Sequence, residues 1–356
     1  MRPINHLWIL LFLFKSAITS AQTCDSMALC DCASKDLSPA AVMIGHEHSK
    51  GIWKISYRYM SMMEKNSLSG TAKVDDNTIF NNYLMSPQNM RMDMHMIMAM
   101  YGFTNKFSVM AMFNYNVVSM NMAMLPGSTM QMDGATMVMT TNNNSMSTHS
   151  SGLGDTKLYA VYTLINHNDH HVFLSEGLNI PTGSIQMKGK SGDIVYPDQR
   201  LPYMMQLGSG SWDFMPGLTY LLKKNKLSAS AQLTSVIRPF TNSLNYHLGN
   251  EFTFNVWAAY KWFPWMSTSI RLEGNSVGKI SGYDASLWAG WEPSANPLCY
   301  GGQTISSFIG LNFYSTKGCL RNNKLFVEYG MPVYQNLNGT QLALTSTLYA
   351  GWLISF

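Results

Sequence analysis

Hydrophobic and polar residues alternate along most of the chain after residue 52, in runs of ten residues or more. In each run one face is apolar and the other is polar, which is typical of a β-strand between two different environments. Soluble strands average about five or six residues, whereas about 9–11 tilted residues cross a bilayer. The pattern therefore predicts transmembrane strands, near 52–63, 90–102, 107–120, 153–165, 171–182, 206–222, 227–238, 251–262, 266–279, 304–315, 324–334 and 341–356.

The connections between these twelve runs are alternately short and long. Residues 104–106 and 263–265 are tight turns, for example, whereas 121–152 and 280–303 are long loops. Outer-membrane barrels have this arrangement because their turns face the periplasm and their loops face outside. An even number of strands also puts both chain ends on the periplasmic side. The predicted fold is all-β, a transmembrane antiparallel up-and-down β-barrel of about twelve strands over residues 52–356.

The two ends of the chain carry features of export and outer-membrane assembly. Residues 1–21 resemble a signal peptide, with Arg2 ahead of a short apolar core and small residues before a cleavage site. Residues 22–51 would then form a periplasmic N-terminal segment. The final strand ends in Phe356, an ending that we expect the barrel-assembly machinery to recognise. The expected location is the outer membrane of a Gram-negative cell, with outer-membrane lipid around the barrel.

The composition excludes several other classes of protein. Charged residues make up 12%, against about 25% in an ordinary soluble domain. At 46% hydrophobic and 12% aromatic residues, the chain can bury a large surface and is not disordered. After residue 21 no segment is apolar for long enough to be a membrane-spanning helix. The formal net charge of +4 is too small to indicate a nucleic-acid partner.

The cysteines are concentrated near the N-terminus, where Cys24, Cys30 and Cys32 are followed only much later by Cys299 and Cys319. In the oxidising periplasm the three clustered cysteines could form a disulfide, within the segment or to the barrel. A thiolate metal site is the alternative. An odd count leaves one thiol unpaired in either case.

Several blocks of sequence resemble a known family of outer-membrane proteins. The blocks are GLGDTKLYAVYTL (152–164), EGLNIPTGS (176–184), LGSGSWDFMPGLTYL (207–221), IGHEHSKGIWKISYRYMSM (44–62) and MRMDMHMIMAMYG (90–102). They are similar to the family named for a meta-pathway of phenol degradation, often labelled "transporter", and the last two to a Met- and His-bearing subgroup of it. The resemblance implies an outer-membrane channel for small solutes, with aromatic or hydrophobic compounds as candidates.

Charged residues on predicted inward faces are the candidates for lining the lumen. Arg or Lys facing lipid at mid-depth would cost about 2–4 kcal/mol, so these side chains are expected to point inward. They could form a structural lattice of ion pairs or a constriction that selects solutes. The residues are Lys54, Arg58, Arg91, Asp93, His95, Asp155, Lys157, Glu176, Arg271, Glu273 and Glu328.

Methionine is unusually frequent, with 29 residues. Six of them occupy alternate positions from Met90 to Met100, opposite Arg91, Asp93 and His95, and are therefore expected to face lipid. Another group lies in the long loop after the third strand, where a polar segment has no core to fill. Thioethers are soft donors that suit Cu(I) or Ag(I), so Cu(I) is a possible ligand or cargo. The candidate metal ligands are His46, His48, Met122, Met124, Met130, Met132, Met137, Met139 and His149.

No spacing of Ser, Cys, His or acidic residues resembles a catalytic motif, so an enzyme is not expected. Three functions remain: a channel for small solutes, a copper- or silver-linked porin, and a metal-binding barrel that transports nothing. Conductance separates the last of these from the other two, because a plugged barrel passes no ions.

Overall fold

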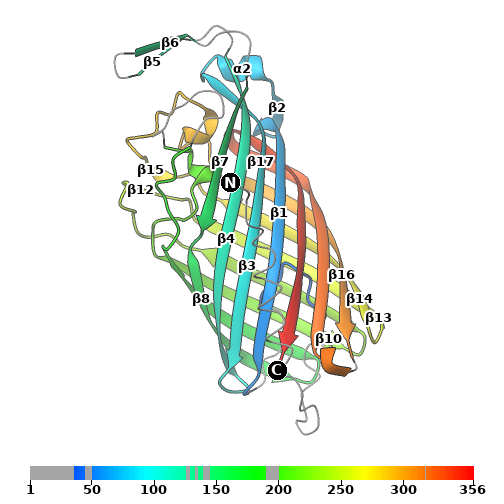
Figure 1. Ribbon diagram of the computed structural model, residues 1–356. Coiled ribbons are helices and arrows are strands. Elements are labelled where there is room, and N and C mark those ends of the chain that lie inside the picture. Colours follow the sequence, from blue (N-terminus) through cyan, green and yellow to red (C-terminus); the bar gives the residue numbers. More distant parts are fainter. Residues whose placement is uncertain are drawn as a thin grey trace, which may run out of the picture.

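The computed structural model describes residues 36–44, 50–125, 129–132, 135–138, 145–189, 200–316 and 318–356. They form a closed antiparallel β-barrel with long extensions at one end (Figure 1). The strands that make up the wall are β1 (Trp53–Gly70), β3 (Met85–Gly102), β4 (Phe107–Met124), β7 (Ser145–Leu153), β8 (Thr156–His167), β9 (His170–Ile180), β10 (Asp213–Lys224), β11 (Leu227–Val236), β13 (Glu251–Phe263), β14 (Met266–Val277), β16 (Gly302–Ser315) and β17 (Asn323–Ser355).

The barrel closes because the last strand pairs with the first, and β17 is in fact a hairpin. Its first half pairs with β16, from Asn323 to Leu337, and its second half pairs with β1, up to Ser355. Within β17, the Gln335 side chain bonds the backbone of Leu344 in both directions, which joins the two halves. With β17 counted as two strands, and β7 and β8 as one because both pair with β4, the wall has the twelve strands that the alternation predicted, and the predicted fold class is confirmed.

One wall strand is interrupted. β7 pairs with the upper part of β4 and β8 with its lower part, so 145–167 crosses the wall once with a break at Gly154. Gly154 lies so close to the Asn114 side chain that a Cβ there would be 2.2 Å from Asn114 Nδ2. Glycine is therefore required at the break.

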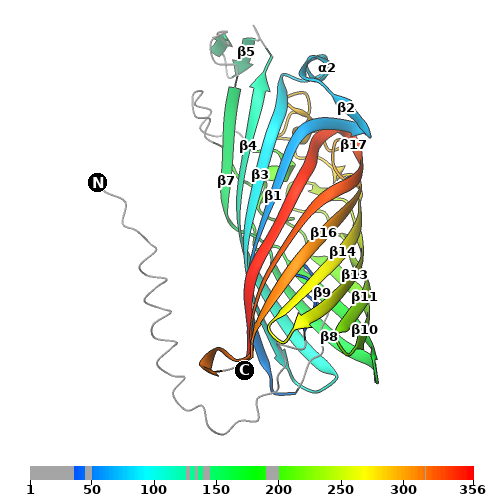
Figure 2. The ribbon, with the colours of Figure 1, turned by 90° about the vertical axis from the view of Figure 1, so that its right-hand side faces the viewer.

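The end of the barrel away from both Trp53 and Phe356 carries the loops (Figure 2). They contain β2 (Ala72–Val74), α2 (Asp76–Phe80), β5 (Thr129–Met132), β6 (Ala135–Val138), η1 (Tyr203–Met205), β12 (Tyr246–His247), β15 (Ser281–Gly282) and η2 (Pro293–Ala295); η3 (Gly318–Leu320) lies in a turn at the other end. None of the helices in the described part of the chain is long and apolar enough to cross a membrane.

The outer surface of the wall is apolar, as a lipid-facing surface must be. Side chains that are 51–65% exposed alternate with buried polar ones along the strands, for example Phe252, Phe254, Ile270 and Ile309. Aromatic rings gather at the turn end, where Phe263 stacks on Trp265 with ring centroids 5.4 Å apart. This arrangement matches the interfacial girdles of outer-membrane barrels.

Candidate functional site: the barrel lumen

Residues 36–44, the lumenal segment, cross the inside of the barrel. Their backbone is bound by inward-facing side chains from opposite parts of the wall. Lys324 of β17 donates to the Ser38 carbonyl at 2.8 Å, and Gln232 of β11 donates to the Ile44 carbonyl at 2.9 Å. The expected periplasmic segment 22–51 therefore includes nine residues that lie within the lumen.

Charged side chains hold the centre of the lumenal segment. Arg58 donates to the carbonyls of Ala40 and Val42, and the Ala41 N–H donates to Glu328 Oε2 at 2.9 Å. These partners are buried, so each bond satisfies a group that would otherwise be costly to bury. The segment therefore occupies the lumen by specific bonds rather than by loose apolar contact.

The wall of β1, β3 and β4 lines the lumen with methionine. Met96 lies directly opposite Arg58 on the neighbouring strand, and the pairs Met98–Met112 and Met100–Met110 are in register beside it. The even-numbered methionines of β3 therefore face inward, and the expectation that Met90 to Met100 face lipid is wrong. The physical reason is the lumenal segment, whose Leu37, Val42 and Ile44 supply the apolar surface that these thioethers cover.

The polar residues of β3 consequently face outward, which corrects the expected lumen role of Arg91, Asp93 and His95. Arg91 pairs with Asp93 at 2.9 Å, and the Tyr59 hydroxyl donates to Asp93 at 2.7 Å. The Tyr57 hydroxyl lies 2.8 Å from His95 Nδ1. Because these groups satisfy one another, the outer face tolerates them at a lower cost than isolated charges.

The opposite part of the lumen is polar and charged. Arg271 of β14 lies between Glu328, at 2.7 Å, and Glu273, and its guanidinium carbon is 3.7 Å from the centroid of the Phe308 ring. Arg271 and Glu328 are almost fully buried, at 2% and 1% exposed. Lys54 is also buried on the inward face of β1. Methionine therefore dominates the inward faces of β3 and β4, whereas these buried charges lie on β1, β14 and β17.

The three remaining candidate lumen residues, Asp155, Lys157 and Glu176, lie in different surroundings. Lys157 is half-buried, opposite inward-facing Asn179. Asp155 is buried at the break before β8, where it accepts bonds from the backbone N–H groups of Gly183 and Ser209, at 2.9 and 2.8 Å. Glu176 is exposed on the outward face of β9, which corrects its expected inward position. Small side chains, such as Ser175, occupy the inward positions beside it.

Two of the predicted copper ligands lie in the barrel wall and a third lies on its outer face. Met122 and Met124 lie in β4 and are buried, at 1% and 4% exposed, whereas His149 of β7 is exposed on the outer face. The backbones of Met130 and Met137 are paired in the β5–β6 hairpin, which also contains Met132. His46, His48 and Met139 lie outside the described residues, as do the signal peptide and Cys24, Cys30 and Cys32. Among the described residues Cys299 is a free, buried thiol.

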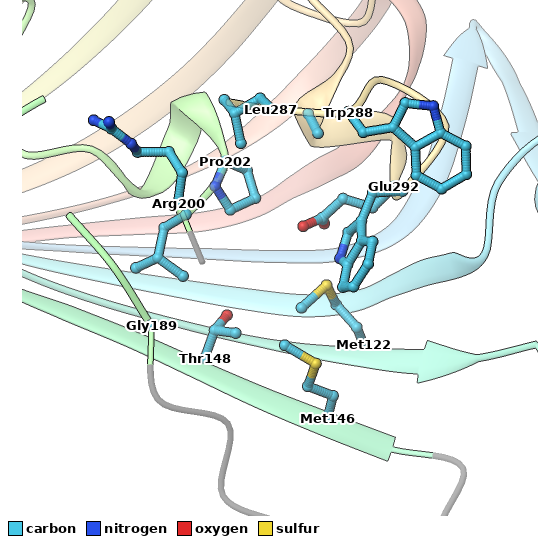
Figure 3. Close-up of a pocket in the computed structure, with 12 residues that line it drawn as sticks. Met122, Met146, Thr148, Gly189, Arg200, Pro202, Leu287, Trp288 and Glu292 are labelled. Atoms are coloured by element: carbon cyan, nitrogen blue, oxygen red, sulfur yellow. The ribbon is translucent and has the colours of Figure 1, made fainter. Parts of the chain in front are cut away.

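A pocket opens at the loop end of the lumen and encloses about 450 Å³ of empty space, its opening included. In Figure 3, Met122, Met146 and Thr148 project from the strands on one side, and Pro202, Leu287, Trp288 and Glu292 from loops on the other. Arg200 and Glu292 are the two charged residues of the lining. Small-molecule sites are mostly apolar with a few placed polar groups, and the lining of this pocket has that character. The closed part of the pocket measures only about 30 Å³, so flexible side chains such as Met122 and Met146 would have to move aside to admit a solute.

Because Glu292 is buried, we expect the docking of loop 278–301 to depend on pH. Burial raises the pKa of this carboxyl from its ordinary value of 4.5 to about 7. As the pH rises above 4.5, the Glu292 carboxyl loses its proton in the released loop before it does so in the docked loop. The free energy of docking therefore weakens with rising pH until the carboxyl is ionised in both states, above its raised pKa. The total loss of docking free energy is on the order of 3 kcal/mol.

Glu292→Gln should therefore abolish this pH dependence and leave the loop more firmly docked at neutral pH. Limited proteolysis of the loop at about pH 5 and about pH 8 measures the effect. The wild-type loop should be cleaved faster at the higher pH, whereas the Glu292→Gln loop should be cleaved at the same rate at both pH values. Equal protection of the wild type at both pH values would show that Glu292 does not control docking.

Sequence reasoning missed three parts of this site: the lumenal segment, the Trp288–Glu292 loop and Glu64. Glu64 lies on the inward face of β1, where it is 7% exposed and its Oε2 has no hydrogen-bond partner. A signal was present in the sequence, because Glu64 continues the even-numbered positions that include Lys54 and Arg58. The first predicted run ended at residue 63 and therefore left out Glu64 by one position.

The closed wall, apolar outside and lined with polar and methionine side chains inside, defines a β-barrel of the outer-membrane type. Within that class, residues 122–285 match the family model described as "Putative MetA-pathway of phenol degradation". This match agrees with the family that the sequence blocks resemble, whereas the Met- and His-bearing subgroup stays a prediction. No curated protein matches the chain in sequence.

One solved structure has a similar fold, and two others have TM-scores too low to bear on it. An outer membrane channel from Pseudomonas putida F1 has a TM-score of 0.57 at 13% identity, over 90% of this chain and 100% of that one. A toluene transporter from Ralstonia pickettii, TbuX, has a TM-score of 0.43 at 11% identity, over 90% and 94% of the two chains. A FadL homologue from Pseudomonas aeruginosa has a TM-score of 0.42 at 10% identity, over 86% and 90%. At these identities the likeness concerns the fold alone.

Proposed function

We propose that the protein is an outer-membrane channel that admits small apolar solutes, aromatic compounds among them. The pocket of Figure 3 carries the proposal. It opens at the loop end and is lined by Trp288, Trp291, Leu287 and two thioethers. The same cluster of buried side chains continues downward through Met90 and Met120. A solute bound in the pocket would therefore meet apolar surface on its way into the lumen.

The lumen below does not suit hydrated solutes. The lumenal segment packs on the methionine wall, and the opposite wall is closed by the pairing of Arg271 with Glu328 and Glu273. A wide aqueous pore would instead need an open, water-filled bore like that of large porins. An apolar solute can displace or slide along flexible methionine side chains, which repack easily. The name of the matched family, with its reference to phenol degradation, is consistent with this class of solute.

Uptake of a fluorescent apolar probe by porin-deficient Gram-negative cells tests the proposal. Met146→Glu places a charge on the pocket side of β7 and should lower uptake several-fold, because an apolar solute would then meet an ionised group. Ser147→Glu is the matched control, since Ser147 is the next residue on the same strand and is exposed on the outer face. It should leave uptake unchanged.

Equal uptake by the Met146→Glu variant and the wild type would contradict the proposed path. Faster passage of a hydrophilic sugar than of the apolar probe would identify the protein as a general porin instead. Both variants must reach the outer membrane in equal amounts, which heat-modifiable mobility on gels measures.

A further inference from the structure

Glutamate and methionine side chains form a continuous row across three strands at the loop end of the lumen. Glu64 of β1 is in register with Met90 of β3, and Met90 is in register with Met120 of β4. Directly opposite residues of an antiparallel pair have Cβ atoms about 4.5–5.5 Å apart and project from the same face. All three face the lumen, at 7%, 2% and 1% exposed.

A second small pocket lies over this row and is distinct from the pocket of Figure 3. Glu64, Met90 and Met120 line it, and Met204 of η1 covers it from the loops. Its closed part measures about 10 Å³, enough for an ion but not for an organic solute. Three methionines and one glutamate therefore line one small space, contributed by the wall on one side and by a loop on the other.

The Glu64 carboxylate is the unusual group, because its Oε2 has no hydrogen-bond partner. A buried carboxylate without a partner is costly, and such groups are usually paired or bound to a metal. The other residues around it are Ser67, Pro87, Pro293, Ser294, Thr340, Gln341 and Leu342, so the pocket lining contains no cationic side chain. A bound cation would supply the missing charge.

The donors select the kind of cation. Thioether sulfur is a soft donor that favours Cu(I) and related ions, whereas Mg²⁺ and Ca²⁺ require several oxygen ligands. In the described part of the chain no group of three or more His, Cys, Asp and Glu side chains is placed to hold a metal. These residues therefore offer a harder ion no cluster of the ligands that it prefers. One carboxylate also balances the single charge of a monovalent ion.

We propose that Glu64, Met90, Met120 and Met204 form a binding site for a soft monovalent cation, Cu(I) or Ag(I). This site is different from the loop site that the sequence suggested, because its methionines belong to the barrel wall and to η1. It goes beyond the channel function and does not depend on it, since binding at equilibrium requires no transport.

The test is a titration of the purified full chain in detergent with Cu(I), in competition with a chromophoric Cu(I) chelator. Ag(I) and Zn²⁺ are titrated in parallel, and accessible cysteines are alkylated beforehand so that thiolates do not bind the metal. Because changes outside the ligand shell already cost about 10- to 100-fold in metal affinity, Met90→Leu/Met120→Leu should weaken Cu(I) binding by at least that factor. Glu64→Gln should weaken it too, since it removes the charge while keeping the shape.

Two controls separate this site from general binding by methionine. Met98→Leu/Met112→Leu removes another cross-strand pair of the same wall, and Met331→Leu removes a methionine that is 52% exposed on the outer face. Both should keep wild-type affinity. Met204 lies outside the wall strands, so Met204→Leu should weaken Cu(I) binding without affecting assembly of the barrel. If a wall variant fails to fold, the Cu(I) affinity of Met204→Leu tests the proposal in its place.

Four outcomes would overturn the proposal. The first three are the absence of Cu(I) and Ag(I) binding by the wild type, equal affinity of wild type and the Met204 and Met90/Met120 variants, and a preference for Zn²⁺. An equal loss in the Met98/Met112 control would also overturn it, because the donors would then be the methionine wall as a whole. Uptake of apolar probes is unaffected by any of these outcomes, so the channel function stands or fails separately.

Discussion

Deleting the lumenal segment, residues 36–44, is expected to raise the ionic conductance of the reconstituted barrel several-fold. The segment occupies the turn-end half of the lumen, and its backbone is bonded to β1, β10, β11, β16 and β17. With it removed, the side chains that bind it face water. Lys324, Arg58 and Glu328 would then line an open, charged path for hydrated ions, as polar lumens do in porins. Single-channel recording in planar bilayers measures the change.

A matched control separates blockage from a general loosening of the barrel. Val42→Ala/Ile44→Ala shrinks two apolar side chains of the segment but keeps the carbonyl groups that Arg58 and Gln232 bind. Its conductance should stay close to that of the wild type. If the deletion conducts no better than the wild type, the lumen must be closed elsewhere, and the loops around η1 and η2 are the remaining candidates.

The strands were predictable because one physical constraint acts along their whole length. A barrel wall between lipid and lumen imposes a period of two, and β13 shows it plainly, with Phe252, Phe254 and Val256 outside and Asn255 inside. Strand ends were less predictable. The upper parts of β1, β3 and β4 extend beyond the predicted runs, where the alternation no longer separates lipid from lumen.

The faces of β3 were not predictable from that strand alone. Its two faces carry methionines and charged residues, and the cost of placing charge in lipid suggested that the charges point inward. The orientation is decided by residues far away in the sequence. Leu37 and Val42 offer the methionines an apolar partner inside, while Tyr57 and Tyr59 offer Asp93 and His95 hydrogen bonds outside. A shift of one residue exchanges the two faces entirely.

The lumenal segment and the Glu64 site share a reason for having been missed. The segment has no periodicity, and it is bound mainly through its carbonyl groups, which every residue carries. Glu64, Met90, Met120 and Met204 come together only through strand pairing and a returning loop. Sequence identified thioether chemistry in this protein, but the fold decides which methionines share a space.

The buried ion pair of Arg271 and Glu328 is expected to have the largest effect on stability. Both groups are 1% exposed in their side chains and bond at 2.7 Å, and Glu328 also accepts from the Ala41 N–H. Removing one partner leaves the other charge buried, which typically costs about 3–5 kcal/mol. Replacing both partners by apolar residues of similar size is often neutral or stabilising.

Arg271→Met should therefore lower the free energy of unfolding by about 3–5 kcal/mol, and Glu328→Leu by a similar amount. The double variant should lose clearly less than the sum of the two, because neither charge is then left alone. Urea unfolding in lipid vesicles, followed by tryptophan fluorescence, gives the three values. Lys226→Met is the control for charge alone, since Lys226 is exposed in the turn between β10 and β11, and it should leave the free energy of unfolding close to that of the wild type. A double variant that loses the full sum would mean that Arg271 and Glu328 stabilise the barrel independently, through Phe308 and Ala41 respectively, rather than through each other.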